Sequence, residues 1–103
     1  MGQGSDGAAI VHDKQMGFSR TDFVRTLPRV FGPDACQVAG DRATWSDGAG
    51  RRVEIEMGPE RERRIALIRL PYMDVRLRLT GFTDAEAAAF MVRFDRSYQR
   101  GGG

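Results

Sequence analysis

The residues from Val53 to Leu79 alternate between apolar and charged side chains, and at Thr83 the spacing of the apolar residues changes to that of a helix. Successive side chains of a strand point to opposite faces of its sheet, so the alternation predicts antiparallel strands with one apolar face. Apolar residues that recur every three or four positions predict an amphipathic helix. The chain is therefore constrained to a sheet that packs one face against helix.

The length of 103 residues is enough for one domain. Residues 1–17 contain four glycines and no sustained periodicity, which predicts a flexible N-terminal tail. Residues 101–103 are all glycine and predict a second flexible tail. We expect a single α+β domain over residues 18–100.

A first helix is predicted to begin after Ser19, whose hydroxyl can cap the amide of Asp22. Its apolar stripe consists of Phe23, Leu27, Val30 and Phe31, with Val24 at the margin. Pro28 lacks an amide hydrogen and predicts a kink or a break near Leu27. Gly32 followed by proline ends the helix.

Short strands are expected next, separated by turn residues at 40–41, 47–50 and 58–60. The segment from Arg63 to Leu70 is apolar on both faces, which predicts a central strand or one whose second face is covered by a partner. Pro71 is expected to end that strand or to force a bulge. The predicted strands are 36–39, 42–46, 52–57, 63–70 and 73–80.

The second helix has the clearest sequence pattern. Thr83 and Glu86 form a capping box, and the apolar residues that follow occupy one sector of the helix. The predicted fold is an α+β two-layer sandwich, in which a four- or five-stranded antiparallel meander is covered on one face by two helices. Its predicted core comprises Phe23, Leu27, Val30, Val53, Ile55, Ile65, Leu67, Val75, Leu77, Leu79, Phe90, Met91 and Phe94.

Composition limits the compartment and the class of protein. Cys36 is the only cysteine, so an intrachain disulfide is excluded and a reducing compartment is favoured. Neither a signal peptide nor an apolar run of the roughly 20 residues that a membrane helix needs is present. We expect a cytoplasmic protein that does not associate with membranes.

Catalytic and cofactor sites are not predicted by any residue pattern. His12 and Cys36 have no obvious activating or ligating partners, and the paired carboxylates Glu54 and Glu56 sit among arginines. The glycines of residues 2–7 match the spacing of a dinucleotide-binding loop but follow no strand. We therefore expect a protein that is not an enzyme and binds no metal or cofactor.

Fifteen arginines give the chain its basic character, although the net charge is only +2. Arg52, Arg64, Arg76 and Arg78 are predicted on the outer sheet face and are the candidate surface for an anionic partner. In the alternative interpretation, neighbouring carboxylates neutralise these arginines. Trp45 either extends that surface as a stacking platform or lies beneath a helix.

Two resemblances concern the end of the chain. Residues 70–81 and the ending Phe94-Asp95-Arg96-Ser97-Tyr98-Gln99-Arg100 resemble small uncharacterised bacterial proteins, which implies a free-standing bacterial protein and no particular activity. The terminal glycines superficially resemble the diglycine tail of ubiquitin-like sulfur carriers, whose fold ends on a strand, whereas a helix is predicted here.

The sequence thus favours a non-enzymatic protein-interaction module whose partner is another protein or a second copy of the chain. Binding of nucleic acid or another polyanion through the arginine surface is the alternative. A carrier role for the glycine tail is a further, less favoured possibility.

Overall fold

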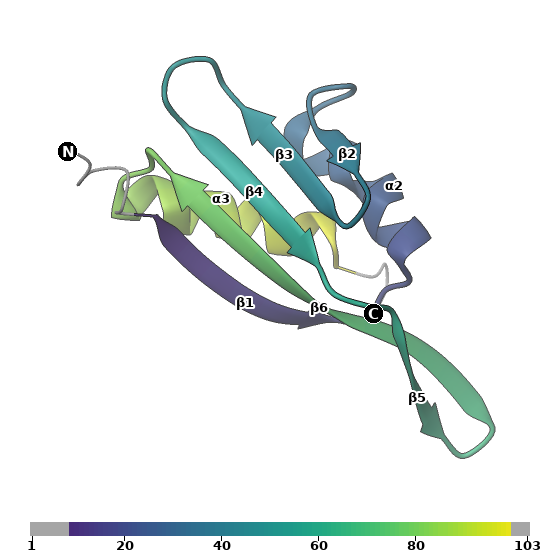
Figure 1. Cartoon of the computed structure of the whole chain (residues 1–103). Helices are drawn as coiled ribbons and strands as arrows, with labels where there is room; N and C mark the ends of the chain where they lie inside the picture. Colours follow the sequence, from purple (N-terminus) through teal and green to yellow (C-terminus); the bar gives the residue numbers. More distant parts are fainter. Residues whose placement is uncertain (1–8, 100–103) are drawn as a thin grey trace.

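The computed structural model describes residues 9–99 (Figure 1). Within these residues, two helices and six strands form an α+β sandwich, and the predicted order of helix, antiparallel strands and helix is confirmed. One additional strand precedes the first helix, so the sheet has six strands where four or five were predicted. The elements are β1 (Ile10–Met16), α2 (Arg20–Phe31), β2 (Gln37–Ala39), β3 (Arg42–Ser46), β4 (Arg52–Met57), β5 (Arg61–Ile65), β6 (Ile68–Thr80) and α3 (Asp84–Ser97).

The sheet is antiparallel throughout, with the strand order β1-β6-β4-β3-β2 and with β5 paired to the first part of β6. Strand β1 occupies one edge, with Ile10 opposite Leu79 and Met16 opposite Met73. Residues 10–16 were predicted within a flexible tail, and that prediction is wrong for them. The exposure of their side chains alternates, and the face that is less exposed carries Ile10 and Met16 together with the polar residues His12 and Lys14.

Both helices cover the same face of the sheet (Figure 1). The inward residues of β4 and β6 pack against Phe23 and Leu27 of α2 and against Phe90 and Phe94 of α3. Eleven of the thirteen predicted core residues are buried, and Ile65 and Leu67 are the exceptions. The ion pair between Lys14 Nζ and Asp95 Oδ1, at 2.9 Å, links β1 to α3.

The ends of the helices follow the sequence closely. Ser19 Oγ accepts a hydrogen bond from the Asp22 amide at 3.1 Å, and Thr83 and Glu86 form the predicted capping box. Helix α2 continues through Pro28 to Phe31, so the predicted break near Leu27 is absent. Pro28 is exposed, and it has no amide hydrogen to donate to the Val24 carbonyl one turn earlier.

The turn between β6 and α3 requires glycine. Gly81 has φ +81°, and a Cβ atom added there would lie 2.1 Å from the carbonyl oxygen of Gly50. Any other side chain would therefore collide with the backbone of the β3–β4 loop. This contact fixes where α3 begins relative to the sheet.

Tyr98 joins the two helices at the end of α3. Its hydroxyl donates a hydrogen bond of 2.6 Å to the Phe23 carbonyl of α2, and its ring stacks on the Phe23 ring. The polar group of this buried side chain is thereby satisfied.

Among residues 9–99, no helix is long and apolar enough to cross a membrane.

Candidate functional site

The most distinctive surface is a two-stranded ribbon formed by residues 61–72, which we call the ribbon. It consists of β5 and the first part of β6 and extends beyond the other strands (Figure 1). It contributes no side chain to the core. The molecule consequently measures 53 Å along its longest axis and 25 and 24 Å along the others.

A β-bulge marks the base of the ribbon. Met57 pairs with Val75 and Arg61 pairs with Tyr72, so the β4–β5 chain has one more residue than β6 between these two pairs. The Gly58 amide donates to the Asp74 carbonyl at 2.8 Å, which leaves Pro59 and Glu60 opposite Met73. Residues 58–60 therefore bend one long strand, whereas the sequence predicted a turn there.

The base of the ribbon is fixed to helix α2. The Glu60 carboxylate accepts a hydrogen bond of 2.8 Å from the Arg20 amide, a donor that has no partner within the helix. The Arg20 guanidinium donates to the Gly40 carbonyl at 3.0 Å and to the Gly58 carbonyl at 3.4 Å. These hydrogen bonds connect the base of the ribbon to α2 and to the turn between β2 and β3.

The far end of the ribbon is a two-residue turn of Ala66 and Leu67 between the paired residues Ile65 and Ile68. Ala66 has φ +55°, a conformation that glycine adopts far more readily. The Leu67 side chain is 100% exposed. This turn corrects the prediction of one continuous strand over residues 63–70, and the absence of glycine or asparagine explains why the sequence did not reveal it.

The ribbon continues through Pro71, where the sequence predicted an end to the strand or a bulge. Pro71 pairs with Glu62, and β1 does not extend alongside this part of β6. A proline is tolerated there because its missing amide hydrogen would point away from β5, where the strand has no partner.

The register gives the ribbon two different faces, since residues directly opposite each other in an antiparallel pair share a face. The arginine face carries Arg64 opposite Arg69 and Glu62 opposite Pro71. The aliphatic face carries Ile65, Ile68 and Leu70, together with Arg61, Arg63 and Tyr72. Four of the seven large hydrophobic side chains exposed among residues 9–99 are Ile65, Leu67, Ile68 and Leu70.

A groove of about 440 Å³ lies where the aliphatic face approaches the body. Ile65, Leu70 and Tyr72 line one part, and Gly17 and Asp22 line the part next to the start of α2. The groove is mostly apolar, with Asp22 and Arg63 as its charged residues. Its size and lining suit a side chain of a bound partner.

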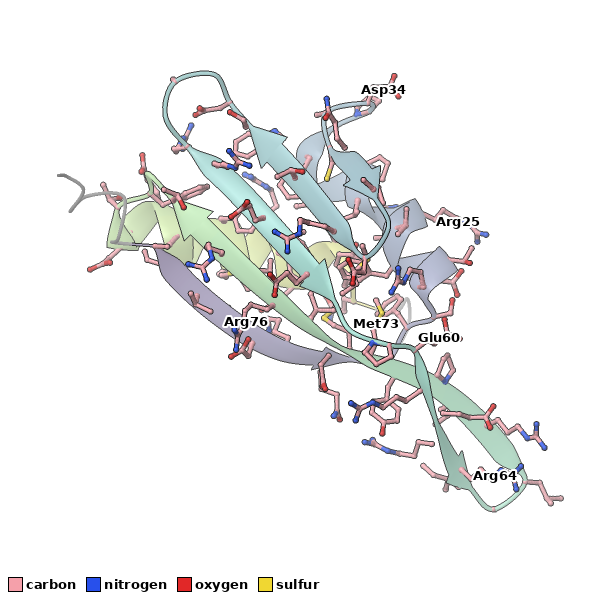
Figure 2. The ribbon with its side chains drawn as sticks, viewed as in Figure 1. Arg25, Asp34, Glu60, Arg64, Met73 and Arg76 are labelled. Atoms are coloured by element: carbon pink, nitrogen blue, oxygen red, sulfur yellow. The ribbon has the colours of Figure 1, made fainter. Side chains whose placement is uncertain are left out.

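The four arginines of the ribbon differ in whether they contact other side chains of the protein. Arg61 approaches Asp74 at 3.9 Å, while Arg63 donates to Gln15 at 3.0 Å and stacks 4.7 Å from the Tyr72 ring centre. Arg64 and Arg69, by contrast, have no ion-pair partner among residues 9–99, although they lie directly opposite each other. Figure 2 shows Arg64 near the far end of the ribbon.

Arg52 lies on β4, and Arg76 and Arg78 lie on the second part of β6, in the main sheet. Figure 2 shows Arg76 apart from Arg64. Arg76 binds Asp13 through two nitrogen atoms, at 2.7 and 3.3 Å, and this hydrogen bonding lowers the pKa of Asp13. Arg52 pairs with Glu54 at 3.3 Å. Arg78 lies opposite Glu54 in the β4–β6 register. The predicted arginine surface is therefore interleaved with carboxylates on the main sheet.

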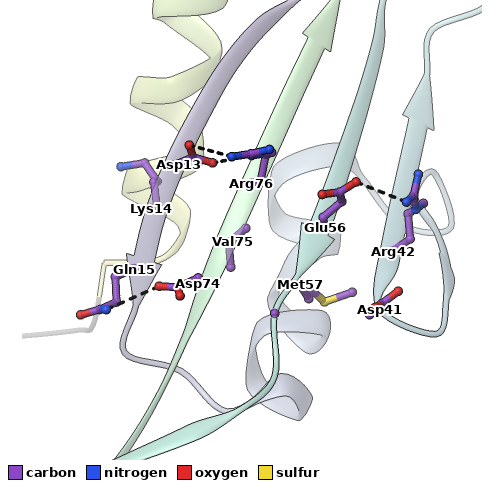
Figure 3. A pocket seen from close by; sticks show the side chains of 11 residues that line it. Asp13, Lys14, Gln15, Asp41, Arg42, Glu56, Met57, Asp74, Val75 and Arg76 are labelled. Atoms are coloured by element: carbon purple, nitrogen blue, oxygen red, sulfur yellow. Dashed lines mark hydrogen bonds and ion pairs between the residues drawn. The ribbon is translucent and has the colours of Figure 1, made fainter.

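A shallow groove of about 700 Å³ crosses this part of the sheet (Figure 3). Its charged lining consists of four carboxylates and three basic side chains, several of which are paired: Asp13, Lys14, Asp41, Arg42, Glu56, Asp74 and Arg76. Opposite charges this close largely cancel at a distance. This groove consequently offers little attraction to a polyanion.

The other residues that the sequence offered as possible site residues lie on separate parts of the fold. His12 lies on β1 rather than in a tail, and Trp45 stacks on Phe31 of α2 with ring centres 5.5 Å apart, as one of its two interpretations predicted. Burial raises the pKa of the half-buried Cys36 thiol, which keeps it protonated. Over residues 9–99, no cluster of His, Cys, Asp or Glu could hold a metal ion. Gly2–Gly7 and the terminal glycines lie outside the described residues.

Arg69, Tyr72 and the exposure of Leu67 were not predicted from the sequence. The available signal was the combination of apolar residues on both faces of 63–70 with a dense run of arginines at its start. A buried central strand rarely carries three arginines within four positions.

The comparisons with known protein families, curated proteins and solved structures found no match to the chain.

Proposed function

We propose that the chain is a non-enzymatic protein-interaction module that docks a partner protein through the ribbon. The observation that carries this proposal is the concentration of exposed aliphatic side chains on a projecting element that contributes nothing to the core. Apolar groups gathered in this way are typical of an interaction site, whereas scattered ones need no explanation. The fixed base holds the ribbon ready for binding.

The partner is a protein other than a second copy of the chain. The ribbon carries four arginines and one glutamate, so two ribbons brought together would repel each other. A surface that combines apolar groups with carboxylates complements the ribbon better than the ribbon complements itself. We further propose that the protein acts in the cytoplasm, as its single cysteine favours a reducing compartment.

Binding of a polyanion through Arg52, Arg64, Arg76 and Arg78 is favoured less. Arg52 and Arg76 already pair with carboxylates, and Arg64 lies on a separate element. The specific contacts of protein–DNA interfaces are normally built on a much more positive surface. The apolar groove beside the ribbon also suits an aliphatic side chain better than a phosphate.

The proposal is tested by photocrosslinking with competition. A photoreactive amino acid replaces Leu67 at the end of the ribbon or, as a matched control, the exposed Ala88 of α3. Extract from the source cells is irradiated in the presence of excess unlabelled protein. The competitors are the wild type and a variant in which an Asn-Gly turn replaces residues 61–72, since Glu60 and Met73 lie opposite each other.

We expect one protein to crosslink at position 67 and not at position 88. Wild-type competitor should abolish that crosslink, and the ribbon-shortened competitor should leave it intact. Equal competition by both proteins would show that the ribbon is dispensable for binding. Light scattering of the purified protein provides the check for a second copy, because a stable dimer that is lost on shortening the ribbon would contradict binding of a different protein.

A further inference from the structure

Within the part of the chain that the structure describes, the outer edge of β5 has no neighbouring strand. Among residues 9–99, β5 pairs only with β6, and all five of its residues are exposed. Its outward backbone amides and carbonyls therefore have no sheet partner, which makes the edge a template for another strand. The opposite edge of the ribbon is interrupted by Pro71, which has no amide hydrogen to donate.

The arginine face next to this edge carries two arginines and one glutamate, so it has a net positive charge. Like charges directly opposite each other destabilise a sheet, and Arg64 faces Arg69 without an ion-pair partner among the described residues. A carboxylate on a strand added beside Arg64 would lie within reach of its guanidinium and relieve this repulsion. Glu62 lies on the same face and would repel a second carboxylate. An acidic side chain of the added strand is therefore favoured beside Arg64 and not beside Glu62.

The other face offers apolar contact. A strand added to β5 would place one side chain beside Ile65, on the face that also carries Ile68 and Leu70 of β6, and its other side chains on that face beside Arg63 and Arg61. The groove of about 440 Å³ continues this apolar surface toward the body. An aliphatic side chain next to an acidic one therefore matches the two faces of the ribbon.

We infer that β5 binds an extended acidic segment of the partner protein as an added antiparallel or parallel strand, with a carboxylate beside Arg64 and an aliphatic side chain beside Ile65. This inference rests on the proposed function and specifies its chemistry. Backbone hydrogen bonds along the edge supply affinity, and the alternation of acidic and aliphatic side chains supplies specificity. The positive charge of the ribbon selects against pairing with the ribbon of another copy.

The experiment uses the full chain and synthetic peptides. The probe is a labelled peptide that alternates glutamate and valine, and the control peptide has the same composition with its glutamates and valines in separate blocks. Binding is measured by fluorescence anisotropy at low and moderate salt. Hydrogen exchange of the β5 amides is measured with and without peptide, because only an added strand protects the edge amides.

We expect the alternating peptide to bind more tightly than the block peptide and to slow exchange along β5. Replacing both Arg64 and Arg69 by glutamate should weaken binding by roughly tenfold or more, because two attractive charges become repulsive. The control variant Arg29→Glu changes an exposed arginine of α2, far in sequence from the ribbon, and should bind as the wild type does. A peptide with N-methylated backbone amides should lose binding.

Equal binding of the alternating and block peptides, or unchanged β5 exchange, would overturn the added strand. Tight binding of a DNA duplex that depends on Arg64 and Arg69, without binding of the peptide, would replace it by the polyanion alternative. If the peptides fail while the crosslinking competition still requires the ribbon, this inference falls and the proposed docking function stands. If that competition does not require the ribbon, the proposed function itself falls.

Discussion

Single residues account for both the rigidity of the body and the unusual end of the ribbon. Tyr98 closes the junction of the two helices with one buried hydrogen bond, and Gly81 permits a backbone contact that no other residue tolerates. Ala66 behaves differently, since it holds a backbone conformation that is unfavourable for alanine at a fully exposed turn. A strained conformation at an exposed position is more common at functional sites than elsewhere.

The substitution Ala66→Gly tests this strain. Glycine adopts φ near +55° without penalty, so the ribbon should gain about 1 kcal/mol of local stability. Hydrogen exchange of the ribbon amides should slow accordingly, while exchange in the rest of the sheet stays unchanged. Faster exchange of the ribbon in the glycine variant would show that Ala66 is not strained.

The substitution Tyr98→Phe tests the helix junction. Removing the hydroxyl deletes the bond to the Phe23 carbonyl and should lower the free energy of unfolding by about 1 kcal/mol near neutral pH. Urea unfolding measures the difference. A variant as stable as the wild type would mean that the hydrogen bond contributes nothing to stability.

The substitution Tyr98→Phe should also change how the free energy of unfolding depends on pH. Burial raises the pKa of the Tyr98 phenol far above its ordinary value. Tyr98 ionises in the unfolded chain near pH 10 but stays neutral in the folded one, so its contribution is complete below about pH 10 and falls as the pH rises further. Unfolding of Tyr98→Phe should therefore depend less steeply on alkaline pH than that of the wild type. Equal dependence would contradict the raised pKa.

At the scale of elements, a single strand, β6, belongs to two different structures. Its second part lies between β1 and β4 in the core sheet, and its first part pairs only with β5 in the ribbon. The bulge at Pro59 and Glu60 separates the two parts. The alternation of side chains continues through both, but it has opposite consequences for burial.

Leu77 in β6 and Leu67 in the turn before β6 provide a matched pair of substitutions, one at a buried leucine and one at an exposed leucine. Leu77→Ala should lower the free energy of unfolding by roughly 2–5 kcal/mol because Leu77 is completely buried. Leu67→Ala should change it by no more than about 0.5 kcal/mol because Leu67 is completely exposed. Denaturant midpoints measure both. Similar losses in the two variants would mean that the ribbon end packs against something in the folded protein.

The elements that the sequence predicted well have local signals. The cap at Ser19, the capping box at Thr83 and Glu86, and the alternation from Met73 to Leu79 each follow from residues close together in the chain. The errors concern relations that are not local. Apolar residues at 65–70 indicate a strand but not whether anything covers it, so Ile65 and Leu67 were wrongly assigned to the core.

Strand β1 and the turn at the far end of the ribbon also could not be predicted from the sequence. Residues 10–16 become a strand because β6 offers an edge distant in sequence, and their own composition contains little strand signal. The turn at Ala66 uses a residue that rarely occupies this conformation, so no turn signal was present. Of the candidate site, the sequence identified Arg64 but not its opposite partner Arg69, because the pairing depends on that turn.

At the scale of the whole molecule, stability and recognition are assigned to different parts. The two-layer body contains every buried hydrophobic side chain among residues 9–99, and the ribbon contains most of the exposed large ones. Charge divides in a similar way, because the ribbon carries four arginines and one glutamate whereas three carboxylates of the main sheet pair with arginines of the same sheet. Such a division allows the contact surface to change without loss of the fold.

Urea unfolding of the ribbon-shortened protein tests this division most directly. Because residues 61–72 contribute nothing to the core, the shortened protein should remain folded, with a free energy of unfolding within about 1 kcal/mol of the wild type, while Leu77→Ala serves as the control for true core damage. A loss as large as that of Leu77→Ala, or failure of the shortened protein to fold, would show that the ribbon supports the fold and contradict its role as a separate docking element.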